Sequence, residues 1–291
     1  MVEEVGDSIW RITSAHPGTH VLIFGAIHGN EKTGIETVKH LVKAFSDGSR
    51  TLASGTLTLA LANTRAMAEN ERWVGGKDLN RYFTDAHLLK GVEGSWEEER
   101  AGILAKLCQE ADILLDIHSS NRPAIPFACS RIDAAHERVY KWFPFENVIE
   151  DPEFVFGDEP VTSEEYMDRI GKVGVCVETG LCESLDRLDA IIKSCEGVMV
   201  EFGLLNIPAP ALPKKKPATY RFYKTIKLSA RGFEFAKGMG THSFQPVRAG
   251  EVIGHQGEDT VTLDRDGVII FPKIKEYQQL GKPVCYIAIP V

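Results

Sequence analysis

The chain has 291 residues, of which 43% are hydrophobic and 25% charged, a composition typical of a globular protein with a sizeable core in one large domain or two unequal ones. The formal net charge of −8 argues against broad binding to nucleic acid or to an anionic membrane, because such binding normally needs a basic face. The charge does not exclude a small cationic pocket.

Apolar runs rich in β-branched residues alternate with amphipathic stretches along the first two thirds of the chain. The strand candidates are "HVLIFGAI" (20–27), "GTLTLALAN" (55–63), "ADILLDIH" (111–118) and "GVCVET" (174–179), and the helix candidates are 32–46, 97–110, 133–142 and 184–204. Nearly continuous apolarity in the strands indicates that both faces of the sheet are covered. The alternation predicts an α/β sheet that is at least partly parallel.

The pattern changes at "NIPAPALPKKKPAT" (206–219), where four prolines and three consecutive lysines make a continued helix implausible. Short alternating segments follow, such as "YRFYKTIKLSA", "TVTLD" and "GVIIFP", and "DRDG" (264–267) is typical of a hairpin turn. We therefore predict an α/β domain over residues 1–206, a linker at about 207–218 and a smaller, mostly-β domain over 219–291.

The N-terminal sequence and the cysteines suggest a cellular location. "MVEEVGDSIW" is acidic and has no apolar stretch, so we expect no secretory signal. No apolar run approaches the roughly 20 residues that a membrane-spanning helix needs. The six cysteines form no CxxC pair, and several lie in apolar runs where a thiol behaves as a small buried hydrophobe. These features predict a soluble protein of the reducing cytoplasm.

The stretch "VLIFGAIHGNEKTG" (21–34) places a histidine and a glutamate directly after an apolar strand. His28 and Glu31 are three residues apart, so a tight turn or helix start can point both side chains the same way. "DIHSS" places His118 at the carboxyl end of another strand, where open α/β sheets bind their ligands. Two imidazoles and a carboxylate suit Zn²⁺ and leave one position for water. An isolated HxxE is common by chance, so structural or merely exposed histidines are the alternative.

Asp116 precedes His118 by two residues and therefore points to the same side of the strand. Its carboxylate could accept the remaining N–H of a metal-bound imidazole. The alternative is a carboxylate that caps a loop.

Four motifs, "GAIHGNEKTG", "KDLNRYF", "DIHSS" and "VCVETG", occur in this order between residues 25 and 180. Together they resemble the aspartoacylase and succinylglutamate desuccinylase family, a branch of the zinc-carboxypeptidase-like hydrolases, and their joint occurrence by chance would be rare. The resemblance covers most of the chain, because the family's appended β domain matches the tail. It implies a zinc-carboxypeptidase-like mixed sheet flanked by helices, with a smaller, mostly-β C-terminal domain.

The resemblance also implies roles for the chemical groups. His28, Glu31 and His118 would hold one zinc ion per chain, and Glu178 of "VETG" would be the general base and acid. A carboxylate beside a metal can take a proton from the bound water and return it to the leaving amine. A salt-bridged acid at a strand end is the structural alternative for Glu178.

Three further residues would bind the substrate around the reacting bond. In the family, Asn80 and Arg81 of "KDLNR" hold the α-carboxylate, which a guanidinium can bind through two parallel hydrogen bonds. Arg72 resembles the arginine that polarises the scissile carbonyl and stabilises the oxyanion. Arg72 stands one residue farther from "DLNR" than the family pattern, and Arg65 of "NTRAM" competes for the role.

Three residues resemble side chains that bind the rest of the substrate. Tyr166 and Arg169 precede Glu178 where aspartoacylase has a tyrosine and an arginine near the substrate's side-chain carboxylate, although the spacing differs by about one residue. Tyr277 of "PKIKEYQQ" resembles a tyrosine that the C-terminal domain contributes, and a core tyrosine is the alternative.

The resemblance implies a zinc-dependent amidohydrolase that deacylates an N-acyl amino acid to a carboxylate and a free amino acid. Its partner would be a small anionic substrate held by arginines inside an acidic protein, without nucleic acid or membrane, and a homo-oligomer is compatible with the sequence. The alternatives are a metallocarboxypeptidase acting on peptides, which shares the zinc motif and the catalytic glutamate, and a catalytically inactive binding protein with the same fold.

Overall fold

The structure is a computed structural model that describes residues 1–75, 77–88, 94–121, 124–153 and 161–291. Its strands are β1 (Val2–Gly6), β2 (Ile9–Thr13), β3 (His20–Gly25), β4 (Thr56–Leu61), β5 (Ile113–Ser120), β6 (Phe127–Cys129), β7 (Asn147–Glu150), β8 (Val173–Leu181), β9 (Ala218–Lys227), β10 (Glu234–Phe235), β11 (Gln245–Val247), β12 (Val252–Gln256), β13 (Asp259–Thr262), β14 (Gly267–Ile270) and β15 (Pro283–Pro290). Its helices are α1 (Lys32–Ser46), α2 (Thr64–Glu69), α3 (Asp85–Leu88), α4 (Trp96–Glu110), α5 (Ala134–Tyr140), α6 (Ser163–Arg169) and α7 (Leu188–Glu201), with short 3-10 helices η1 (Leu79–Arg81) and η2 (Lys275–Tyr277).

The strands and helices predicted for the first two thirds of the chain are confirmed. The four predicted strands are β3, β4, β5 and β8, and the four predicted helices are α1, α4, α5 and α7. Helix α7 is shorter than the predicted 184–204. It ends where Gly203 takes a φ of 76°, the left-handed conformation that commonly follows a helix and that glycine adopts without strain.

The main sheet is mixed, as predicted. Its strand order is β1-β2-β4-β3-β5-β8-β6-β7-β9-β15-β14-β11. Strand β3 pairs in parallel with β4 and β5, and β5 pairs in parallel with β8. Strand β6 runs antiparallel to β8, and the N-terminal hairpin β1–β2 joins β4 antiparallel. The parallel centre brings the carboxyl ends of β3, β5 and β8 to one edge.

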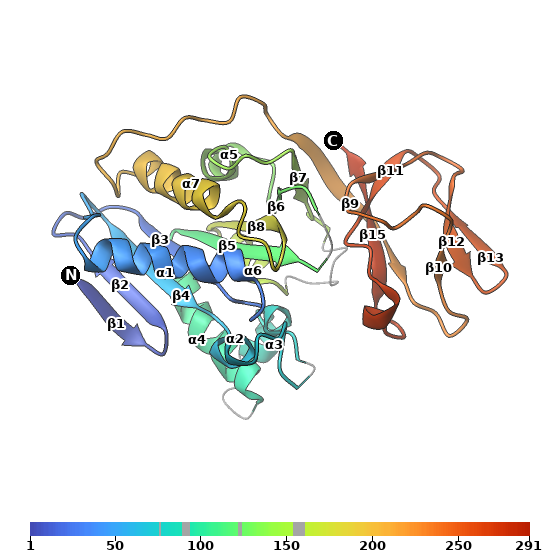
Figure 1. Ribbon diagram of the computed structural model, residues 1–291, viewed down its shortest axis with the longest axis horizontal. Coiled ribbons are helices and arrows are strands. Elements are labelled where there is room, and N and C mark those ends of the chain that lie inside the picture. Colours follow the sequence, from blue (N-terminus) through green and yellow to red (C-terminus); the bar gives the residue numbers. More distant parts are fainter. Residues whose placement is uncertain (76, 89–93, 122–123, 154–160) are drawn as a thin grey trace.

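Helices cover both faces of this sheet, as Figure 1 shows. Ile113, Leu115 and Ile117 of β5 pack in a core cluster with residues of α1, α5 and α7. Leu114, on the other face of β5, packs with residues of α4 and α6. Because side chains alternate along a strand, Asp116 points to the same face as Leu114, toward α6.

The C-terminal part is mostly β, as predicted, and continues the main sheet. Strand β9 pairs in parallel with β7 and antiparallel with β15. A second, three-stranded sheet, β10-β12-β13, packs its apolar side chains in a separate core cluster. The main sheet therefore passes without a break from the α/β part into the β-rich part, and the proposed domain boundary stays a prediction.

The prediction of a hairpin turn at residues 264–267 is wrong. Strand β13 pairs with β12, whereas β14 pairs with β11 and β15, so the segment connects two different sheets. Its aspartates bind neighbouring segments instead of closing a turn. Ala249 N donates to Asp266 Oδ1 at 2.9 Å, and Tyr223 Oη donates to Asp264 Oδ2 at 3.0 Å.

The proline-rich segment between α7 and β9 forms no helix, as its sequence predicts, and crosses from one element to the other as a long loop (Figure 1). Among the helices that the structure describes, none has the length and apolarity to cross a membrane.

Candidate active site

Two neighbouring strands bring four polar side chains to the face that α6 covers. In the register of β5 and β8, His118 lies beside Glu178 and Asp116 lies beside Cys176. Members of each pair point the same way in parallel strands, and residues two apart share a face. The prediction that His118 ends a strand is therefore confirmed, with Glu178 as its immediate neighbour.

The loop after β3 carries His28 and Glu31 to the same place. Ala26 has a φ of 59°, a left-handed conformation that L residues rarely adopt, at the point where the chain leaves the strand. Gly29 lies so close to α2 that a Cβ there would be 2.1 Å from the backbone carbon of Ala66. Glu31 is the N-cap residue of α1, and its side chain contacts His28.

His28, Glu31 and His118 form one buried cluster whose ligand atoms all lie within 4.8 Å of one another. His28 Nδ1 is 2.8 Å from Glu31 Oε1, His118 Nδ1 is 3.0 Å from Glu31 Oε2, and the two Nδ1 atoms are 3.2 Å apart. Despite the short contact with His118, no aligned hydrogen bond from a described residue reaches Glu31 Oε2. Two ring nitrogens that converge on each other and on an incompletely bonded carboxylate are a suitable ligand set for a metal ion.

The electrostatics of the cluster keep its carboxylate ionised. Burial alone would raise the pKa of Glu31, but the neighbouring His28 and His118 outweigh burial and lower it. Burial alone would lower the pKa of His118, but Asp116 and then Glu31 raise it well above its usual value. A metal ion held by this cluster would likewise place a positive charge beside Glu31.

The outer nitrogen of each histidine lies next to an aspartate. His118 Nε2 is 3.0 Å from Asp116 Oδ2, although the ring N–H is not aligned for a hydrogen bond, and Ser163 Oγ donates to the same carboxylate. His28 Nε2 is 3.1 Å from Asp78 Oδ1. Carboxylates in such positions fix the tautomer and orientation of metal-binding histidines. The contact between Asp78 and His28 was not predicted from the sequence, although Asp78 lies in the motif "KDLNR".

Glu178 has the properties of a proton-transfer group. It is 8% exposed, and none of the residues that the structure describes forms a hydrogen bond with its Oε2 atom. Burial, with a contribution from Glu31, raises its pKa to about 7, although His118, Arg72 and His28 oppose the rise. A carboxyl group with a pKa near neutrality can both accept and return a proton.

Arg72, and not Arg65, lies at the cluster. Arg72 Nη1 donates to Glu31 Oε1 at 2.8 Å, and Arg72 O accepts a hydrogen bond from Gly29 N at 3.2 Å. Arg65 is exposed, with its guanidinium 5.6 Å from the ring centroid of Trp96. The geometry thus separates the two candidates that the sequence leaves open.

Asn80 and Arg81 lie on the wall of a cavity beside the cluster. Asn80 Oδ1 accepts from Ser163 N at 3.0 Å, an arrangement in which the side chain keeps its NH₂ group as a donor. Arg81 Nη2 is 3.7 Å from Asp78 Oδ2. Lys273, from the segment after β14, lines the same cavity, and its contribution had no signal in the sequence motifs.

The three outer predictions have different outcomes. Tyr166 does not reach the cavity: it is 2% exposed, and it packs against Phe83 in the core, with its hydroxyl accepting from Gln109 Nε2 at 2.7 Å. Arg169 lines the cavity but is paired with Asp85 at 2.9 Å. Tyr277 lies on the wall and is half exposed.

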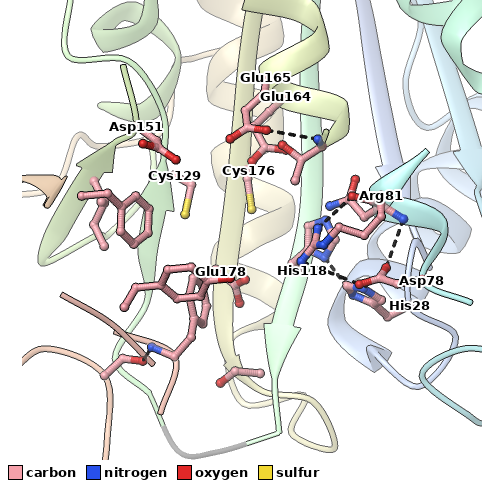
Figure 2. Close-up of a pocket in the computed structure, with 18 of the residues that line it drawn as sticks. His28, Asp78, Arg81, His118, Cys129, Asp151, Glu164, Glu165, Cys176 and Glu178 are labelled. Atoms are coloured by element: carbon pink, nitrogen blue, oxygen red, sulfur yellow. Dashed lines mark hydrogen bonds and ion pairs between the residues drawn. The ribbon is translucent and has the colours of Figure 1, made fainter. Parts of the chain in front are cut away.

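The cavity has a volume of about 650 Å³, which suits a small molecule. Figure 2 shows His28, Asp78, Arg81 and His118 on one side of it and Cys176, Cys129 and Asp151 on the other. Aromatic residues from the C-terminal part, namely Phe222, Phe271, Tyr277 and Tyr286, complete its wall. The cavity is therefore built from both parts of the chain.

A family model described as the succinylglutamate desuccinylase/aspartoacylase catalytic domain matches residues 17–195. A probable aspartoacylase of Acaryochloris marina is 36% identical over 106 residues, 34% of this chain and 34% of that protein. A human N-acyl-aromatic-L-amino acid amidohydrolase (carboxylate-forming) is 26% identical over 274 residues, 84% of each chain. The matches to the Acaryochloris protein and to a succinylglutamate desuccinylase of Pseudomonas paraeruginosa span about a third of those relatives' length.

Solved structures share the fold. A succinylglutamate desuccinylase from Vibrio cholerae superposes with a TM-score of 0.80 at 20% identity, covering 98% of this chain and 86% of that one. Murine aminoacylase 3 superposes with a TM-score of 0.71 at 20% identity, covering 96% and 97%. At these identities the structures establish the architecture alone.

Proposed function

The chain belongs to the succinylglutamate desuccinylase/aspartoacylase family, and we propose that it is a zinc-dependent amidohydrolase that deacylates an N-acyl amino acid to a carboxylate and a free amino acid. The observation that carries this proposal is the buried cluster of His28, Glu31 and His118 with Glu178 directly beside it. The proposal includes one Zn²⁺ per chain, a small substrate with an anionic α-carboxylate, and a cytoplasmic location.

The three ligands fit Zn²⁺ because two imidazole nitrogens and one carboxylate oxygen leave a coordination position open. When bound, the ion lowers the pKa of a coordinated water and polarises the amide carbonyl. Asp78 and Asp116 support this assignment, since each lies within about 3 Å of the outer nitrogen of one histidine, the position from which a carboxylate can orient a metal-binding ring.

Glu178 takes the proton of the attacking water and later gives it to the departing amine. Its position beside His118 and its pKa of about 7 suit both transfers. Arg72 stabilises the negative charge that develops on the carbonyl oxygen, because its guanidinium lies against the ligand Glu31.

The α-carboxylate of the substrate binds between Asn80, Arg81 and Lys273. Burial lowers the pKa of Lys273, and the nearby Arg81 and Arg72 lower it further, which places these cations close together. An anion relieves this mutual repulsion, so the group favours a carboxylate ligand.

Two assays test the proposal. Purified protein with Zn²⁺ is offered N-acetyl and N-succinyl amino acids and a blocked dipeptide, before and after chelation of the metal. We expect hydrolysis of an N-acyl amino acid that chelation abolishes. Preferred cleavage of the dipeptide would favour the carboxypeptidase, and bound Zn²⁺ without turnover of any compound would favour an inactive binding protein.

The second assay uses Glu178→Gln. This variant should bind Zn²⁺ as the wild type does and lose turnover by several orders of magnitude, because the amide cannot accept the proton. Glu276→Gln, an exposed acid on the same cavity wall, is the matched control and should retain turnover. Near-normal hydrolysis by Glu178→Gln would reject Glu178 as the base.

A further inference from the structure

The cations on the cavity wall that face the metal cluster form one group. Arg72 contacts Glu31, and Arg81 lies near Asp78. Both arginines lie close enough to Lys273 to lower its pKa. Lys273 has no ion pair with a carboxylate among the residues that the structure describes. In the proposed function Arg72 serves the carbonyl oxygen, so Arg81 and Lys273 account for one substrate carboxylate, the α-carboxylate.

Among the described residues of the wall, two further arginines have acidic partners outside the cavity lining. Arg169 makes two contacts with Asp85, at 2.9 and 3.1 Å, and Arg131 lies 3.5 Å from Asp133. A second carboxylate on the substrate, as in an N-acyl aspartate, would therefore have to compete with Asp85 for Arg169. Among the described residues of the wall, the cations outside the α-carboxylate group are therefore already paired with acids.

The opposite wall is acidic. We define the acidic wall as Glu164 and Glu165 at the start of α6 together with Asp151. Figure 2 shows Asp151 on the side of the cavity away from Arg81, with Glu164 and Glu165 on α6 between them. Glu165 Oε2 accepts from Val161 N at 2.9 Å and from Thr162 N at 3.2 Å, so it is fixed in place. Glu164 is 8% exposed and lines the cavity, and within the described part of the chain its Oε2 atom has no hydrogen-bond partner.

An unpartnered carboxyl oxygen that is nine-tenths buried is costly unless a ligand completes its bonding. Burial raises the pKa of Glu164 to about 8, and the nearby Glu165 and Asp116 raise it as well. A ligand cation would remove this repulsion, whereas a ligand anion would add to it.

We infer that the acidic wall is a subsite for a positively charged group of the substrate, an ammonium at the end of the substrate opposite the α-carboxylate. This inference rests on the proposed deacylase function, because it concerns the part of the same substrate that does not react. The ammonium can belong to the amino acid side chain or to the acyl group. The enzyme thus selects a substrate with one carboxylate and one ammonium over a dicarboxylate.

The test compares pairs of substrates that differ in charge but not in length. Nα-acetyl-L-ornithine is paired with Nα-acetyl-L-norleucine, in which a methyl group replaces the ammonium. N-(4-aminobutyryl)-L-norleucine is paired with N-pentanoyl-L-norleucine in the same way. Nα-acetyl-L-glutamate is the anionic reference. We expect kcat/KM to be about tenfold or more higher for the cationic member of one pair, since a charged hydrogen bond in a buried setting has this order of effect. The pair that responds identifies the source of the ammonium.

Glu164→Gln keeps the shape of the side chain but cannot become a carboxylate when an ammonium binds, and it should reduce the cationic-to-neutral ratio toward one. Glu276→Gln, an exposed acid of the same cavity, should leave the ratio unchanged because solvent screens it. Binding of L-ornithine and L-norleucine, measured by calorimetry, gives a readout independent of turnover and should show the same preference if the side chain carries the ammonium.

Several outcomes would overturn the inference. A cationic-to-neutral ratio near one in both pairs, a preference for Nα-acetyl-L-glutamate, or a ratio that Glu164→Gln leaves intact would each do so while the deacylase function stands. Hydrolysis of none of the five compounds, together with no binding of either amino acid, would reject the inference and the proposed function at once.

Discussion

Replacement of Asp78 by asparagine tests whether the aspartate beside His28 supports the metal site. Asp78 Oδ1 lies 3.1 Å from His28 Nε2, and the Asp78 side chain is 18% exposed. Burial alone would raise the pKa of Asp78, but Arg81 and His28 hold this pKa well below its usual range, so the carboxylate is charged. Asparagine keeps the shape and removes this charge.

The expected loss of zinc affinity can be estimated from how far the contact between Asp78 and His28 is buried. Removing a carboxylate that orients a metal-bound histidine typically weakens metal binding by about 10- to 100-fold, which corresponds to about 1.4 to 2.8 kcal/mol. An exposed ion pair is worth only about 0 to 1 kcal/mol. Because Asp78 is largely buried against a fully buried cluster, we expect the larger range.

The assay is a titration of metal-free protein with Zn²⁺ in competition with a chromophoric chelator. Asp85→Asn is the matched control, because Asp85 is 61% exposed and contacts Arg169 but no histidine of the cluster. We expect Asp78→Asn to weaken Zn²⁺ binding at least tenfold and Asp85→Asn to leave it unchanged. Equal affinities for Asp78→Asn and the wild type would refute the argument that Asp78 orients His28.

Two further predictions concern stability. Gly29→Ala should lower the free energy of unfolding in a denaturant titration by about 1 to 3 kcal/mol, because its Cβ would lie 2.1 Å from the Ala66 backbone. As a control, Gly102→Ala in the middle of α4, where a Cβ has no atom within 4 Å, should raise the free energy of unfolding by up to about 1 kcal/mol. Equal effects of the two substitutions would contradict the close approach of Gly29 to α2. Although burial opposes the shift, Asp168 and Asp133 raise the pKa of His136, so its ionic contacts should stabilise the fold below pH about 6.5 and lose this effect as pH rises through the raised pKa. The difference in unfolding free energy between wild type and His136→Gln should therefore become smaller as pH rises. A difference that does not change with pH would exclude this contribution.

The sequence predicts the centre of the molecule well because local patterns determine it. Buried parallel strands are nearly continuous apolar runs, and His118 and Glu178 follow from strand alternation once those runs are found. The grouping of His28, Glu31 and His118 follows from their places at strand ends. Motif order then adds the chemical roles as proposals.

The residues that were missed or misplaced depend on contacts that no local pattern contains. Residues two apart on a helix point about 200° apart, so Glu164 on α6 faces the cavity while Tyr166 faces Phe83 in the core. Spacing before Glu178 could not reveal which residue faces inward. Lys273 lies in the segment after β14, far along the chain from the motifs that predict the site. Residues 264–267 have the sequence of a hairpin turn, but the strands on either side of them belong to different sheets.

The uninterrupted ladder from β7 through β9 to β15 has a consequence for how this protein can change. Groups proposed to break the bond lie on β5, β8 and the loop after β3, whereas Phe222 on β9, Tyr286 on β15 and Lys273 after β14 reach the same cavity from the C-terminal part. Substitutions in the tail can therefore alter which compounds are accepted while the bond-breaking groups stay untouched. Separating the C-terminal part from the α/β part, by contrast, would leave the backbone hydrogen-bonding groups of a strand edge unpaired and would open the cavity on one side.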